Sequence, residues 1–160
     1  MASSETTSTS LTVGQFNLPT PAGWHMASLI LVGPPDMANQ SVPGQASGFQ
    51  QNLVVVSEPV EEDETTEAYV KKQTAKLKEQ KALHLPPGPL EPVTLPGGRS
   101  GVLFEHVVLG PNREKVRQMQ LISVSGGTVY ALIASHMDGL PFEAQRDAFR
   151  GILVGATLPG

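Results

Sequence analysis

The chain has 160 residues, a length typical of one domain, and 39% of them are hydrophobic, which is enough for a buried core. Charged residues make up 16%, against about 25% in an average soluble protein. The formal net charge of −4 argues against nucleic-acid binding, which requires a basic surface. The absence of cysteine excludes disulfides, thiolate metal ligands and thiol nucleophiles.

The N-terminal segment does not have the pattern expected of a targeting signal. Residues 1–10 are small and polar, without the basic start and apolar centre of a secretory signal. No apolar run approaches the roughly 20 residues that span a bilayer. We therefore expect a soluble, cytoplasmic protein that does not engage a membrane. Residues 1–12 are predicted to form a disordered tail, and residues 13–160 a single domain.

The first half of the chain predicts three strands and one helix. Residues 16–18, 28–32 and 52–57 have the apolar character of strands, and the residues between 33 and 48 form a long loop rich in proline and glycine. Residues 63–81 predict a helix, because acidic residues gather at its start and lysines at its end. Its apolar stripe is narrow and comprises Tyr69, Val70, Thr74 and Leu77.

The second half predicts an antiparallel meander followed by a helix. Residues 85–96 hold five prolines around 93–95, which is an edge strand or an ordered linker. Strands over 101–109, 115–124 and 128–135 are separated by turn sequences at 110–113 and 125–127. A closing helix follows Pro141. The order of elements predicts an α+β fold whose antiparallel sheet has its helices packed on one face.

No constellation of residues indicates catalysis. The histidines, at positions 25, 84, 106 and 136, lack the spacing of metal ligands. Glu105 and His106 are neighbours, but adjacent strand residues point to opposite faces. No glycine-rich phosphate loop is present. We therefore expect no enzyme activity, no cofactor and no metal. A pocket with titratable residues around His106 or His136 would be the alternative.

The middle strand of the meander carries an unusual face. Alternation places Val116, Gln118, Gln120 and Ile122 on one side, so two amides interrupt a row of apolar side chains. Such a face either borders water or receives an apolar partner to which it offers its amides.

Several short segments together resemble DcrB-related domains. They are Phe16-x-Leu18-Pro19 with Gly23-Trp24, the run Leu95-Pro96-Gly97-Gly98-Arg99-Ser100-Gly101-Val102, the triplet Val116-Arg117-Gln118 and the ending Phe149-Arg150-Gly151-Ile152-Leu153. The likeness covers about residues 14–158. Among such proteins, a member without signal or lipid anchor is similar to the Eag chaperones of bacterial type VI secretion.

The resemblance implies a PsbP-like fold, a homodimer, and an open, curved sheet that grips the N-terminal transmembrane helices of Rhs-type or related effectors. The chaperone would shield these helices and aid loading of the effector onto the secretion spike. Gln118 matches a polar client-facing position, with Val116, Gln120 and Ile122 beside it and Ile30 as an apolar contact. The loop 33–48 departs from the pattern. Another cytoplasmic protein-binding or assembly role is the alternative. The client's identity and the sheet face that it uses stay open.

Overall fold

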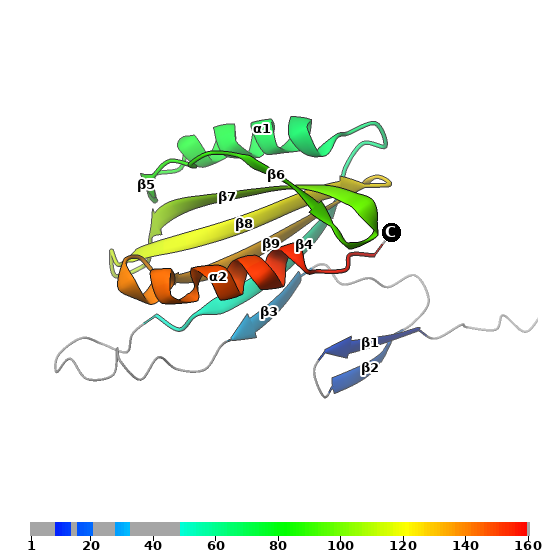
Figure 1. Cartoon of the computed structure of the whole chain (residues 1–160), viewed down its shortest axis with the longest axis horizontal. Coiled ribbons are helices and arrows are strands. Elements are labelled where there is room, and N and C mark those ends of the chain that lie inside the picture. Colours follow the sequence, from blue (N-terminus) through cyan, green and yellow to red (C-terminus); the bar gives the residue numbers. More distant parts are fainter. Residues whose placement is uncertain (1–8, 14–15, 21–27, 33–48, 160) are drawn as a thin grey trace, which may run out of the picture.

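The computed structural model describes residues 9–13, 16–20, 28–32 and 49–159 (Figure 1). The predicted loop 33–48 lies outside these residues. The elements are β1 (Thr9–Val13), β2 (Phe16–Thr20), β3 (Ser28–Val32), β4 (Asn52–Pro59), α1 (Thr66–Lys78), β5 (Leu83–Leu85), β6 (Glu91–Leu95), the short 3-10 helix η2 (Pro96–Gly98), β7 (Arg99–Leu109), β8 (Lys115–Ser125), β9 (Thr128–Met137) and α2 (Leu140–Val154).

An open antiparallel sheet of seven strands forms the centre of the fold. Its order is β3-β4-β9-β8-β7-β5, and β6 also pairs with β7. The predicted meander is confirmed as β7–β8–β9. Gly126 and Gly127 both have positive φ, of 57° and 75°, as a two-residue hairpin turn between right-twisted strands requires. The predicted α+β class and antiparallel sheet are therefore confirmed.

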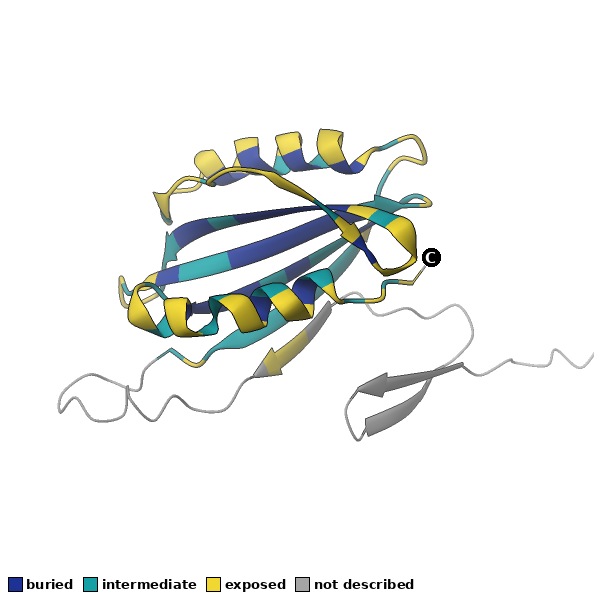
Figure 2. Ribbon diagram, viewed as in Figure 1, coloured by how far each residue is buried: buried dark blue, intermediate teal, exposed yellow. Residues whose placement is uncertain are grey.

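The two helices lie on opposite faces of the sheet, which corrects the expectation that they share one. Leu121 of β8 packs in one apolar cluster with Phe142 of α2. Its neighbour Ile122 packs in a second cluster with Val70 of α1. Figure 2 shows that each helix turns its buried stripe toward the sheet. Because β7 and β8 carry apolar side chains on both faces of the sheet, each face must be shielded from water by a helix of its own.

Helix α1 is fixed to the sheet at its first turn. The Thr65 hydroxyl caps the helix by accepting a hydrogen bond from the Ala68 amide at 3.1 Å. The next hydroxyl, of Thr66, accepts one from the backbone amide of Val124 at 3.0 Å. The start of α1 therefore lies beside the end of β8.

Within the described ranges, no helix is long and apolar enough to cross a membrane.

Two strands differ from the sequence-based expectation. Thr9–Val13 form β1, which pairs with β2, although a disordered tail was expected up to residue 12; residues 1–8 lie outside the described part of the chain. The backbone of β1 finds its partner in β2, an interaction that the composition of the tail does not indicate. The three-residue strand β5 was not predicted, because it exists only through its pairing with β7.

Candidate functional site

The five residues singled out from the sequence lie on the α1 face of the sheet. Alternation along β8 puts Val116, Gln118, Gln120 and Ile122 on this face, together with Val102 and Phe104 of β7. Ile30 reaches the same face from β3. It is paired with Val54, which is paired in turn with Ile133 opposite Gln120. One row across the sheet thus connects the first candidate residue with the amides of β8.

Helix α1 decides which of these side chains a partner can reach. It packs over β7 and β8, where Val70 and Leu77 cover Ile122. Ile122 is therefore buried; Val116 is buried as well, whereas Ile30 is 63% exposed. Beyond α1 this face continues over β9, β4 and β3, where Ala131, Ile133, Val54 and Val56 are partly exposed and Val129 and Ser135 are buried. Client contact through Val116 would require α1 or its surroundings to move, and contact through Ile30 would not.

A groove of about 330 Å³ lies beside α1 on this face. Its floor is apolar apart from the Gln120 amide, and its wall is a polar stripe of α1. The floor is formed by Gln120, Ile122, Val129, Ala131, Ile133 and Val56, and the remaining lining residues are Glu58, Tyr69, Gln73 and Lys76. Two of the five predicted residues, Gln120 and Ile122, line this groove.

The sequence analysis missed the groove wall and the floor positions on β4 and β9. Tyr69, Gln73 and Lys76 have the spacing of residues on one face of a helix. The sequence alone does not indicate that this face lies next to the sheet. Burial raises the pKa of Tyr69, and the nearby carboxylates of Glu58 and Glu64 raise it further. The phenol therefore stays neutral and available as a hydrogen-bond donor at physiological pH.

The amides of β8 belong to a polar row behind the groove. Gln118 donates a hydrogen bond from Nε2 to the Ser135 hydroxyl at 3.2 Å. Nε2 of Gln120 lies 3.5 Å from Nε2 of His106, and Gln120 is only 4% exposed. Burial lowers the pKa of His106 below its usual value, and a hydrogen bond with Gln118 opposes this shift without reversing it. The histidine is therefore a neutral member of the row.

This buried histidine should make stability depend on pH. The unfolded chain binds a proton at His106 more readily than the folded chain, so the contribution of neutral His106 is present above about pH 6.5 and is lost as pH falls through the lower, folded pKa. In urea unfolding at pH 7.5 and 5.5, His106→Gln should lose less stability on acidification than the original chain. His84→Gln, the same change at an exposed position, is the matched control. An unchanged slope in His106→Gln would refute the assignment.

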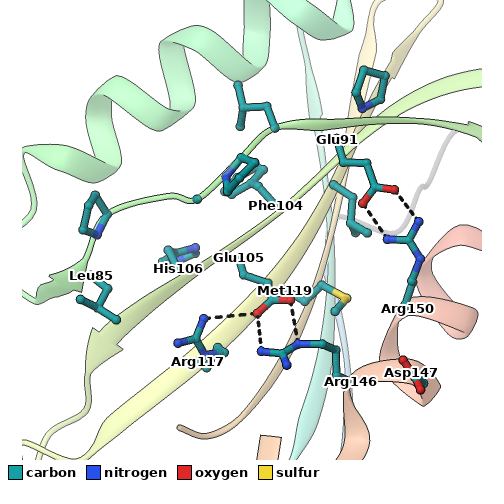
Figure 3. Close-up of a pocket in the computed structure, with 16 residues that line it drawn as sticks. Leu85, Glu91, Phe104, Glu105, His106, Arg117, Met119, Arg146, Asp147 and Arg150 are labelled. Carbon is teal, nitrogen blue, oxygen red and sulfur yellow. Dashed lines mark hydrogen bonds and ion pairs between the residues drawn. The ribbon is translucent and has the colours of Figure 1, made fainter. Parts of the chain in front are cut away.

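A second concave site lies at the edge of the sheet, beside β7 (Figure 3). Strands β5 and β6 both pair with β7, and the segment that joins them lines this site. This edge pocket has a volume of about 730 Å³ and is lined mainly by Leu85, Pro86, Pro89, Leu90, Leu103, Phe104, Met119, Glu91, Glu105, His106, Arg117, Arg146, Asp147 and Arg150. Both oxygens of Glu105 bind Arg146 at 3.1 Å, and Arg117 approaches the same carboxylate at 3.3 Å. Arg150 binds Glu91 with both terminal nitrogens.

The charges of Glu91, Glu105, Arg117, Arg146 and Arg150 in the edge pocket are thus paired with one another. Glu105 bonds to α2, whereas His106 faces the amide row on the other side of the sheet, as adjacent strand residues must. Within the described ranges, no three histidines, aspartates or glutamates are grouped so that they could hold a metal ion.

Comparison with known proteins gives relatives in structure alone. No family model and no curated protein matches the sequence. The crystal structure of a protein of unknown function, PA94 from Pseudomonas aeruginosa, matches with a TM-score of 0.67 over 96% of this chain and 98% of that one. The chain shares the PA94 fold. The two sequences are 12% identical, which establishes the fold alone.

A second solved structure, the cyanobacterial PsbP protein (CyanoP) from Synechocystis sp. PCC 6803, matches with a TM-score of 0.49 and 12% identity. The match covers 85% of this chain and 82% of that one.

Proposed function

We propose that this chain is a chaperone that binds an apolar helix of a partner protein in the groove beside α1. The observation that carries the proposal is the floor formed by Val56, Ala131 and Ile133, three apolar residues of intermediate exposure that line a groove beside α1. Each apolar side chain of a client that is covered there gains about 1.5–3 kcal/mol. The protein itself supplies this binding energy, so the proposed function needs no catalytic residue.

The amide of Gln120 is only 4% exposed at the groove floor, so a client can approach it only with small or polar residues in its apolar stripe. A buried amide that meets only hydrocarbon would lose hydrogen bonds, whereas a hydroxyl or backbone carbonyl of a client restores them. The partner class that fits best is a transmembrane segment held outside its membrane. On the basis of the resemblance to Eag chaperones, we propose that the client is the N-terminal region of a type VI secretion effector. The chaperone would help to load this effector on the secretion spike.

The proposal extends to a homodimer. The groove wall from Tyr69 to Lys76 is about 10 Å long, whereas a transmembrane helix of roughly 20 residues measures about 30 Å. One chain therefore covers only part of such a client. Among the strands that the structure describes, β3 lies at the edge of the sheet and exposes Ile30 and Leu31, and edge strands readily pair with another chain. A second copy would lengthen the covered surface.

Co-expression tests the proposal. A segment of roughly 20 leucines and alanines, fused to a soluble carrier, should remain in the supernatant and co-purify with this chain in the absence of detergent. The matched control is the same carrier with a helix of glutamate, lysine and alanine, which should not be retained. If both fusions behave alike, the chain does not select apolar helices and the proposed function is wrong.

A further inference from the structure

The two ends of the groove carry opposite charges. Glu58 of β4 is paired with Val129 of β9, which is paired in turn with Val124 of β8. The Val124 amide donates a hydrogen bond to the Thr66 hydroxyl, so this row lies at the start of α1. Lys76 lies in the last turn of α1, from which the chain continues to β5 at the opposite end of β7. The groove therefore runs along α1 from a carboxylate to an ammonium group.

Neighbouring residues extend this polarity beyond the lining. The acidic end continues into Glu61, Glu62 and Asp63, which follow β4 after Val60. The backbone bond from the Val60 amide to the Gly127 carbonyl, at 2.9 Å, holds this segment beside the β8–β9 turn. At the other end, Lys78 and Lys81 follow Lys76.

The charges that border the groove are available to a partner. Among the residues that the structure describes, the ion pairs of α1 and its flanks use Glu64 and Lys72, and neither Glu58 nor Lys76 takes part in one. The edge pocket differs in this respect, because its arginines form ion pairs with Glu91 and Glu105. Glu58 and Lys76 can therefore pair with opposite charges on a partner in the groove.

Resting on the proposed function, we infer that the groove binds its apolar helix in one direction, with the end that carries lysine or arginine at Glu58 and the other end at Lys76. Opposite charges attract at both ends in this direction and repel in the reverse one. The N-terminal partial charge of the client helix is attracted by Glu58 but repelled by the start of α1, which runs in the same direction, so the flanking charges of the client set its direction. The best client is therefore an apolar helix with one basic flank.

Spin labels can read this direction because the chain has no cysteine of its own. Nitroxides are attached to Ala68→Cys, in the first turn of α1, or to Gln80→Cys, just beyond its end; both positions are exposed. The client is the carrier-borne leucine and alanine helix with two lysines at its N-terminal end and two aspartates at its C-terminal end. The label at position 68 should broaden NMR signals of the lysine end severalfold more than those of the aspartate end, and the label at position 80 should give the opposite pattern.

Exchange of the two lining charges provides the decisive variant. Glu58→Lys combined with Lys76→Glu leaves the net charge unchanged and should reverse the broadening pattern, or weaken binding of this client by roughly two- to tenfold at low salt. High salt should erase the difference. Equal broadening of both ends, or a pattern that the exchange does not alter, overturns the inference and leaves the chaperone proposal standing. A client that fails to bind in any form overturns the chaperone proposal itself.

Discussion

Replacing Ile133 by glutamate is expected to weaken binding of an apolar helix by roughly 100-fold or more. Ile133 lies in the groove floor between Val54 and Gln120 and is only partly buried, so a carboxylate there stays hydrated in the free protein. A bound client would remove that water and leave an unpaired charge against hydrocarbon, which costs several kcal/mol. Fluorescence titration with the carrier-borne helix measures the loss.

A matched control separates the groove from general surface chemistry. Ile152 is 54% exposed on α2, on the opposite face, and Ile152→Glu makes the same chemical change outside the groove. This variant should bind the client as the original chain does, and Ile133→Val should do so as well because it keeps the floor apolar. Both glutamate variants must show native circular dichroism. Undiminished binding by Ile133→Glu would remove the groove from consideration as the client site.

Phe142→Ala should produce the largest loss of stability, about 3–5 kcal/mol. The Phe142 ring is fully buried between α2 and the sheet and lies 5.6 Å from the ring of Phe149. The guanidinium groups of Arg146 and Arg117 lie 5.3 Å and 6.0 Å from its centroid, so the substitution also removes two cation–π contacts. Typical domains have only 5–15 kcal/mol in total, so this variant approaches the limit of folding.

Urea denaturation followed by circular dichroism checks this value, and Ile152→Ala on the exposed side of the same helix should change stability by less than about 0.5 kcal/mol. The thermal midpoint of Phe142→Ala should fall by roughly 6–20 °C, as the enthalpy of a domain of this size implies. A change below about 1 kcal/mol would mean that α2 contributes little to the core and would contradict the packing described above.

Local sequence chemistry predicted most of the sheet. Strand β3 was expected at its observed bounds, and β8 within one residue, because compact apolar runs and hairpin turn residues act over short distances. The arrangement of the helices was not predictable in the same way. Leu121 and Ile122 are both apolar, so the pattern of β8 is compatible with helices on one face or on both.

The candidate site was predictable only in part for a related reason. The alternation of side chains along a strand is enough to place Gln118 and Gln120 on the same face, and the pairing of β3, β4 and β9 sets Ile30 in the same row as Gln120. The wall of the groove depends on how α1 rotates against the sheet, which is decided by Val70 and Leu77 meeting Val102 and Phe104. Such contacts between distant segments leave no mark in a local pattern.

The burial of β8 on both sides has a consequence for how the strand finds its alignment. In a sheet with one face in water, shifting a strand by one residue would turn its apolar side chains to the solvent, which is strongly unfavourable. In this sheet, a β8 shifted by one residue would still present apolar side chains, Met119 and Leu121 or Ile122 and Val124, to an apolar layer. Correct pairing must therefore be imposed by the connections, where Arg113, Gly126 and Gly127 adopt positive φ. Lengthening either turn would misalign the sheet more readily than changing a residue within it.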